Sequence, residues 1–287
     1  MPFALCDGIR TRYEVRGEGP PLLMFAPGGF DAAIENWRTF SVYARLGLLE
    51  HLPRAFACIA FDKRESGESG GRVERLTWTD YAAQGLGLLD HLGIDRAHVI
   101  GGCIGCSIAA TLASAHPERV ERVVLYSPAG GRRYRETQLR RFAAHAEFVR
   151  ANGLGAVVEL ARTEDRTFAR EPRLGPWASM IRRDERFAAD YAARDVDEYV
   201  ALLDATARGL FDFDDVPGGR LETNAPALVV PGGDANHPPD IARSLARSLP
   251  RAEYWEVAAE EQTAENAPQR VADFLQSSDS PRSSAAI

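Results

Sequence analysis

The stretch Val99-Ile100-Gly101-Gly102-Cys103-Ile104-Gly105-Cys106-Ser107 decides the fold of this chain. Its first residues continue a short apolar strand and its last residues open a helix, so a sharp turn must lie between them. Such a Gly-x-Cys-x-Gly turn forces its central residue into strained backbone angles and leaves no room for a Cβ atom two residues to either side. Because Gly101 and Gly105 lack that atom, we predict that the Cys103 thiol stands at the N-terminal end of the helix, where thiolate is favoured.

Short apolar runs alternate with helical patterns on both sides of this turn. We interpret the first sixty residues as strands joined by turns. The predicted strands of the whole chain are Thr11–Val15, Leu22–Phe25, Ala57–Phe61, His98–Ile100, Val120–Tyr126, Ala227–Val230 and Glu253–Val257. The predicted helices between and after them are Thr79–Leu92, Ser107–Ala115, Pro239–Leu249 and Ala267–Leu275. This alternation predicts an α/β protein with a mostly parallel sheet covered by helices on both faces.

The alternation pauses between Gly130 and Thr223, in a stretch rich in Arg, Ala and Glu. Helical periodicity occurs there at Leu139–Asn152, Ala156–Arg162 and Arg186–Leu210, and no strand is evident. Strand-like sequence then resumes, so we predict a helical insertion at 130–223 within one core formed by 1–129 and 224–275. The Ser-rich residues 276–287 are predicted to be a flexible tail.

Composition excludes several classes of protein. The chain has 287 residues, of which 45% are hydrophobic and 26% charged, as in ordinary globular proteins. A formal net charge of −7 argues against a nucleic-acid partner. We expect no membrane association, because no apolar run of about 18 residues and no secretory signal are visible. Four cysteines in a chain of this length do not make a disulfide framework, and the two cysteines of the Cys103–Cys106 pair are too few for a structural zinc site, so we expect a cytoplasmic protein with no metal and no cofactor.

Four further motifs accompany the Cys103 turn, and with it they resemble the α/β-hydrolase superfamily in that family's order along the chain. They are Phe25–Phe30, Phe61–Ser69, Val229–Asp234 and Ala267–Leu275. The second departs from the family pattern, because Glu65 replaces a glycine. The resemblance implies an α/β-hydrolase fold, with the insertion as a helical cap over the active site. It also implies that Cys103 is the nucleophile and Asp234 the acid, with an oxyanion hole formed by the backbone N–H groups of Ile104 and of Gly29 or Phe30.

The resemblance fails at the catalytic histidine. The family places it just after the last strand, but residues 258–268 contain none, and Glu260 or Glu261 occupies the position, with Glu261 the better fit. Of the six histidines, only His237 falls in a loop at the carboxyl ends of the strands, three residues after Asp234. Two arrangements are therefore open: His237 acts as the base for Cys103, or the Glu261 carboxylate faces the thiol. A carboxylate would oppose ionisation of the thiol unless it were itself protonated.

These residues admit three functions. The first is a hydrolase in which Cys103 attacks an ester, lactone, thioester or activated ketone and forms an acyl-cysteine. The second is a lyase or decarboxylase in which Glu261 handles protons, and the third is a non-catalytic ligand-binding relative. The Cys-x-x-Cys spacing of Cys103 and Cys106 also occurs in dithiol oxidoreductases, but the order of the other motifs does not fit that class.

The insertion supplies the remaining hypotheses on partners. Its arginines favour a small-molecule substrate that is anionic, although a solvated cap surface explains them equally well: Arg132, Arg133, Arg135, Arg140, Arg141, Arg182 and Arg183. Its large apolar side chains either line a pocket or form the core of the cap: Trp177, Met180, Phe187, Tyr191 and Tyr199. A homodimer remains open.

Overall fold

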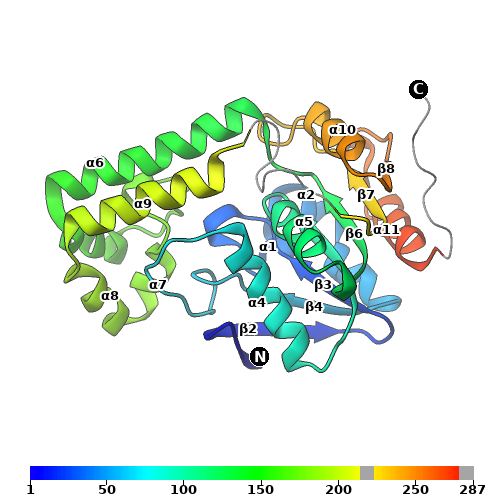
Figure 1. Ribbon diagram of the computed structural model, residues 1–287, viewed down its shortest axis with the longest axis horizontal. Coiled ribbons are helices and arrows are strands. Elements are labelled where there is room, and N and C mark those ends of the chain that lie inside the picture. Colours follow the sequence, from blue (N-terminus) through cyan, green and yellow to red (C-terminus); the bar gives the residue numbers. More distant parts are fainter. Residues whose placement is uncertain (214–222, 278–287) are drawn as a thin grey trace.

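The computed structural model describes residues 1–213 and 223–277, which contain one eight-stranded sheet (Figure 1). The strand order across the sheet is β1-β2-β4-β3-β5-β6-β7-β8. The bounds are β1 Phe3–Cys6, β2 Ile9–Arg16, β3 Pro21–Phe25, β4 Ala57–Phe61, β5 Ala97–Gly102, β6 Val120–Tyr126, β7 Ala227–Val230 and β8 Ala252–Tyr254. Most of the predicted tail, and residues 214–222 of the predicted insertion, lie outside the described residues.

The sheet is mostly parallel, as the apolar runs predicted. The β1–β2 and β2–β4 pairs are antiparallel, and every other pair of neighbouring strands is parallel. All six residues of the central strand β5 are buried. A strand covered on both faces has no solvent side, which explains its continuous apolar sequence. β1 was missed from the sequence because it has only four residues and one of them is fully exposed.

Helices cover the faces of the sheet. α4 (Trp78–His91) and α5 (Gly105–Ala115) pack side by side, α10 (Pro239–Ser248) lies against β7 and β8, and α11 (Asn266–Gln276) contacts α3. A capping box starts α4, because the Thr77 hydroxyl accepts from the N–H of Asp80 and the Asp80 carboxylate accepts from that of Thr77.

One prediction for the first sixty residues is wrong. Three short helices lie between β3 and β4, where strands and turns were expected: α1 Asn36–Thr39, α2 Ser41–Leu46 and α3 Leu48–His51. Each has only four to six residues, which is too short for a helical period to emerge in the sequence. Gly47, at φ 59, provides the left-handed residue that ends α2.

Within the described residues, four helices lie between β6 and β7 and form what we call the helical lobe, residues 131–211. They are α6 Gly131–Thr163, α7 Ala178–Arg183, α8 Glu185–Ala192 and α9 Val196–Phe211. α6 and α9 run alongside each other at the left of Figure 1. The predicted single helix at Arg186–Leu210 is wrong, since it divides into α8 and α9, and Asp195 caps α9 by accepting from the N–H of Glu198 at 2.9 Å.

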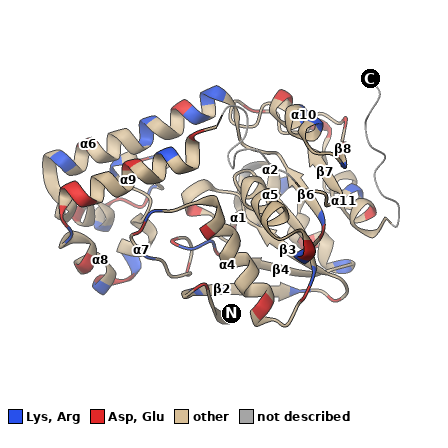
Figure 2. Cartoon of the chain, in the orientation of Figure 1, with Lys and Arg blue, Asp and Glu red and all other residues tan. Residues whose placement is uncertain are grey.

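Charged residues of both signs are distributed over the outer helices, whereas the central strands carry few (Figure 2). No helix of the described residues is both long and apolar enough to cross a membrane. Several hydrogen bonds join the helical lobe to the segment before α4, among them those from the Arg183 guanidinium to the carbonyls of Gly67 and Ser69. The Trp177 indole donates to the Arg72 carbonyl at 3.0 Å, and the Leu76 N–H donates to the Thr206 hydroxyl at 3.2 Å.

Candidate active site

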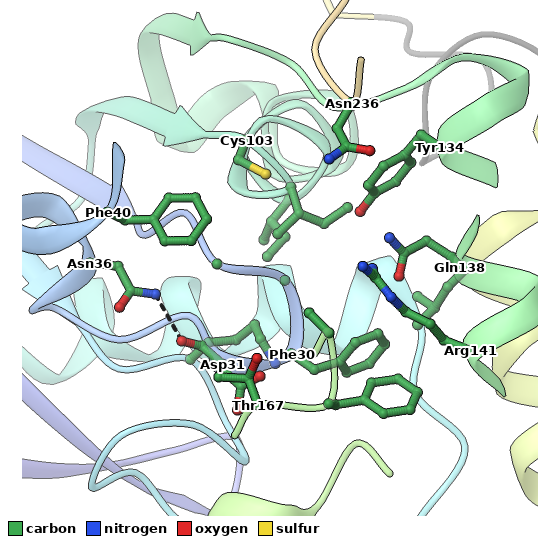
Figure 3. A pocket seen from close by; sticks show the side chains of 18 of the residues that line it. Phe30, Asp31, Asn36, Phe40, Cys103, Tyr134, Gln138, Arg141, Thr167 and Asn236 are labelled. Atoms are coloured by element: carbon green, nitrogen blue, oxygen red, sulfur yellow. Dashed lines mark hydrogen bonds between the residues drawn. The ribbon is translucent and has the colours of Figure 1, made fainter. Parts of the chain in front are cut away.

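Cys103 occupies the turn between β5 and α5, and its backbone has the strained φ of 54. The two flanking glycines are required by close backbone contacts. A Cβ on Gly101 would lie 2.1 Å from the Gly105 carbonyl oxygen, and a Cβ on Gly105 would lie 2.4 Å from the Phe25 carbonyl oxygen. Both distances are far below van der Waals contact, so the local geometry permits only glycine there. The turn holds the Cys103 side chain at the wall of a cavity (Figure 3).

The second cysteine of the Cys-x-x-Cys pair has a different environment. Cys106 lies inside α5, and its thiol donates to the Gly101 carbonyl at 3.1 Å and to the Tyr126 carbonyl at 3.3 Å. Burial raises the pKa of the Cys106 thiol well above its ordinary value. Cys106 therefore stays a neutral hydrogen-bond donor beneath the turn.

The loop after β7 folds into a compact unit that pairs an acid with a histidine. The Asp234 carboxylate accepts from the backbone N–H of Asn236 at 2.8 Å and of His237 at 3.1 Å. The same carboxylate lies 2.9 Å from Nδ1 of the His237 ring. Gly232 leaves room for this loop to close, because a Cβ there would lie 2.4 Å from that of His237. The acid thus orients the imidazole, as in catalytic triads.

The electrostatics of His237 connect it to Cys103. Burial alone would lower the pKa of His237, but the charges and hydrogen bonds of Cys103 and Asp234 raise it to about 10. The hydrogen bond with His237 in turn lowers the pKa of Asp234 to about 2. His237 Nε2 is buried, and among the described residues no hydrogen bond of good geometry engages it. Its electrostatic partner is the Cys103 sulfur, and such catalytic contacts are often poorly aligned before substrate binds.

The predicted oxyanion donors lie on the wall of the same cavity. Gly29 and Phe30 belong to a short 3-10 helix that directly follows β3, and Ile104 follows Cys103 in the turn. A Cβ atom on Gly29 would have no neighbouring atom within 4 Å, apart from the adjacent residues of the chain. The Ile104 N–H has no backbone partner in the described part of the chain. Free N–H groups beside a nucleophile are what a developing oxyanion requires.

The cavity has a volume of about 460 Å³ and lies between the sheet edge and the helical lobe. Apolar side chains make up much of its wall, namely Phe30, Phe40, Trp78, Ile108, Phe168, Leu210 and Phe211. Polar and charged side chains converge on it as well. They are Asp31, Asn36, Lys63, Tyr134, Gln138, Arg141, Thr167, Arg170, Asn236 and His237. Apolar walls with a few convergent polar groups are typical of small-molecule sites.

Asp31 and Lys63 carry opposite charges, and each affects the pKa of the other. Burial raises the pKa of Asp31, and the charges of Lys63 and Arg182 oppose that rise. Burial lowers the pKa of Lys63 to about 8, although Glu65 and Asp31 act against the decrease. Lys63 is held over the Tyr81 ring, 4.4 Å from its centre.

Glu261 is not brought to the thiol. It belongs to a short 3-10 helix after β8, its carboxylate accepts from the backbone N–H of Ala258 at 3.2 Å, and it does not line the cavity. The residue next to it, Gln262, is fully buried instead, and it accepts from the Tyr126 hydroxyl at 2.7 Å and donates to the Pro231 carbonyl at 2.9 Å. A structural hydrogen-bond network therefore occupies the region where relatives carry a histidine.

The predicted pocket residues of the insertion form its core. None of the five large apolar side chains singled out in the sequence lines the cavity. Trp177, Tyr191 and Tyr199 are almost completely buried within the helical lobe. Of the seven arginines, Arg141 alone lines the cavity wall described here.

Sequence reasoning missed the face of α6 that does line the cavity. Tyr134, Gln138 and Arg141 follow one another at intervals of four and three residues, so they share one face of the helix. That spacing was visible in the sequence, but polar residues at helical intervals normally indicate a solvated face.

Comparison with known proteins agrees with this geometry. A model of the alpha/beta hydrolase fold matches residues 21–260. The chain belongs to the alpha/beta hydrolase fold family. A 2-hydroxymuconate semialdehyde hydrolase from a Pseudomonas species is 36% identical over 131 residues, which cover 44% of this chain and 42% of that protein. The acetyltransferase component of an acetoin cleaving system from Cupriavidus necator is 36% identical over 128 residues, covering 45% of this chain and 32% of that protein. The chain thus spans less than half the length of these curated relatives.

Solved structures extend the similarity of fold to nearly the whole chain. The enol-lactonase from Burkholderia xenovorans LB400 superposes with a TM-score of 0.60 and 24% identity, covering 96% of this chain and 100% of that one. At that level of identity the similarity concerns the fold, and function has to be argued from the site.

Proposed function

We propose that the protein is a hydrolase in which Cys103, His237 and Asp234 form the catalytic triad. The observation that carries this proposal is the electrostatic pairing of His237 with the Cys103 sulfur on one side and the Asp234 carboxylate on the other. Asp234 and His237 belong to one loop, the one in which this family carries its acid. That loop therefore supplies both the acid and the base. The helical lobe, in this proposal, is the cap that closes the cavity.

The geometry supports a two-step acyl transfer. In the first step the Cys103 sulfur attacks the substrate carbonyl, and the Ile104 and Gly29 or Phe30 N–H groups stabilise the oxyanion, each by about 3–4 kcal/mol. Forming the S–C bond removes the negative charge that holds the proton on His237, so the pKa of His237 falls. The imidazolium then donates its proton to the leaving atom as that bond breaks: oxygen for an ester or lactone, sulfur for a thioester and carbon for an activated ketone. The product of this step is an acyl-cysteine.

The second step regenerates the thiolate. The now neutral His237 takes a proton from water, and the resulting hydroxide attacks the acyl carbon. The C–S bond breaks, the acid product leaves, and the proton remains on His237 opposite the restored thiolate. The two steps together consume the substrate and one water molecule, and they restore Cys103 and His237 to their starting states.

The substrate class follows from the same chemistry. Esters, lactones and thioesters have carbonyls that a thiolate attacks, and activated ketones can be cleaved in the same way. The names of two relatives, a 2-hydroxymuconate semialdehyde hydrolase and a protein described as a putative carbamate hydrolase, support hydrolytic chemistry. The alternative lyase chemistry through Glu261 has no support from its exposed position outside the cavity.

Trapping the acyl-cysteine tests the proposal. We expect rapid quenching during turnover of a p-nitrophenyl ester to leave an acyl group on the peptide that contains Cys103, detected by mass spectrometry. We also expect iodoacetamide at pH 6.5 to alkylate Cys103 at least about ten times faster in the parent than in His237→Ala, because the imidazolium stabilises the thiolate. Cys103→Ala should lose ester hydrolysis, whereas Cys58→Ala, which removes a buried thiol of β4, should retain it. Turnover without an acyl adduct, or equal alkylation rates, would rule out the mechanism.

A further inference from the structure

Arg141 is a cation of the cavity wall without an anionic partner. Its side chain extends from α6 into the cavity, on the side opposite Cys103 (Figure 3). Among the described residues no carboxylate lies within salt-bridge distance of its guanidinium, whereas neighbouring Arg140 lies 3.8 Å from Glu136. Burial lowers the pKa of Arg141, and Arg170 acts in the same direction while Tyr134 opposes it. An arginine remains charged despite such pKa shifts. Half-burying the Arg141 guanidinium therefore has a desolvation free energy that the protein alone does not offset.

The other charges of the cavity do not neutralise Arg141. Asp31 is the one carboxylate among the described lining residues, and its electrostatic partners are Lys63 and Arg182. Arg170 lines the cavity as a further cation. This end of the cavity therefore has an excess of positive charge, although the whole chain carries a net charge of −7. A local excess of that sign attracts an anionic ligand.

Gln138 adds a second unsatisfied group on the same helix face. The residue is only 6% exposed, and no hydrogen bond engages its amide within the part of the chain that the structure describes. It precedes Arg141 by three residues, so both side chains project into the cavity from one face of α6 (Figure 3). A buried amide and a half-buried guanidinium that both lack partners await hydrogen-bond acceptors from a ligand.

We propose that Arg141, assisted by Gln138, binds a carboxylate of the substrate while Cys103 attacks a carbonyl elsewhere in the same molecule. This inference rests on the proposed function and deepens it, because it assigns the substrate to the carboxylate-bearing esters, lactones or ketones. The planar guanidinium offers paired N–H donors to both carboxylate oxygens, and the Gln138 amide supplies a further donor. Arg141 is thus a specificity-determining residue, and the distance from its guanidinium to Cys103 sets the length of chain between the two groups of the substrate.

A matched pair of substrates tests this role. The monoanionic ester p-nitrophenyl hydrogen adipate and its neutral methyl ester have the same reacting carbonyl and differ in one charge. We expect the parent to hydrolyse the anionic ester with a kcat/KM about 10- to 100-fold higher. Arg141→Gln should abolish that preference, through KM more than kcat, by slowing hydrolysis of the anionic ester far more than that of the neutral ester. Arg140→Gln, which removes the same charge from the adjacent exposed position, should keep the preference.

A binding experiment separates this inference from the proposed mechanism. Cys103→Ala cannot form an acyl-cysteine but retains the α6 face, so it should bind adipate in calorimetry, and adding Arg141→Gln should abolish binding. If the parent shows no preference for the anionic ester, or if Arg141→Gln slows both esters equally, the carboxylate site is disproved. If neither ester is hydrolysed although adipate binds through Arg141, the carboxylate site stands and the proposed hydrolase chemistry fails. Adipate binding that is insensitive to Arg141→Gln would also overturn the inference.

Discussion

At the scale of single residues, the proposed acid and the proposed base lie close together in one loop. His237 lies three residues after Asp234. The Asp234 carboxylate accepts from the Nδ1–H of His237 and also from the backbone N–H of His237. One short loop thus fixes the tautomer and the orientation of the ring. The position after β8 is then free for Gln262, which ties Tyr126 to Pro231.

Replacing each residue in turn with glutamine distinguishes His237 from Glu261 as the catalytic base. His237→Gln should lower kcat by about 10²- to 10⁴-fold, because the proton donor and acceptor of both steps is lost. Glu261→Gln should change kcat by less than about two-fold, since its carboxylate contacts a backbone N–H outside the cavity. Steady-state kinetics on one ester, with folding checked by circular dichroism, gives both values. A larger loss in Glu261→Gln than in His237→Gln would restore the carboxylate as the base.

Glu65 shows how the chain compensates for a departure from its family. The residue has the left-handed φ of 66, a backbone conformation that glycine adopts more readily. Its carboxylate is buried and accepts from the Arg64 guanidinium at 2.9 Å. Burial raises the pKa of Glu65, and the charges of Lys63 and Arg64 counteract this. The backbone strain, about 1–3 kcal/mol for such a residue, persists because removing the carboxylate would take an ion-pair partner from the buried Lys63 and Arg64 side chains.

At the scale of elements, predictability follows the length and regularity of each pattern. The strands β3 and β4 and the helix α5 could be predicted because each is a run of apolar or small residues bounded by turn residues. The helices α1 to α3 were missed because none extends beyond two turns. The nucleophile turn and the pair of Asp234 and His237 could be inferred from spacing. The cavity face of α6 could not, because its three polar side chains resemble a solvated face until the partner surface is known.

Within the helical lobe, the buried His145 is expected to make stability depend on pH. Its ring lies 2.7 Å from the Tyr199 hydroxyl and 2.9 Å from the Arg173 carbonyl oxygen. Burial lowers the pKa of His145 to about 4. Between pH 4 and about 6.5 the unfolded chain therefore binds a proton that the folded chain does not, so the free energy of unfolding rises with pH across this window. The contribution is fully present above about pH 6.5 and amounts to about 3 kcal/mol.

Urea unfolding between pH 4 and 7 measures this effect. The difference in unfolding free energy between the parent and His145→Gln should grow with pH over that range and then level off. His116→Gln, at the exposed end of α5, serves as the control and should follow the parent. Parallel curves for the parent and His145→Gln would show that His145 is not the titrating group.

At the scale of the whole molecule, the helical lobe and the sheet share one aromatic cluster. Phe30, from the loop after β3, has its ring centre 5.4 Å from that of Phe142 on α6, 5.6 Å from that of Phe168 and 6.4 Å from that of Phe211 on α9. The same Phe30 carries a predicted oxyanion N–H. Packing of the lobe against the sheet is therefore coupled to the geometry of the site, and we expect the two parts to unfold together.

Removing one ring from this cluster tests that coupling. Phe142 does not line the cavity, and its ring also lies 5.3 Å from Phe168 and 5.9 Å from Phe211. Phe142→Ala should cost about 3–5 kcal/mol of unfolding free energy through lost burial and the cavity left behind. Calorimetry should still show one cooperative transition, shifted to lower temperature, because the ring supports both parts at once. Phe187→Ala, which removes a half-buried ring stacked on Tyr191 away from the sheet, should cost less than half as much. Two separate transitions in Phe142→Ala would show instead that the lobe unfolds independently of the sheet.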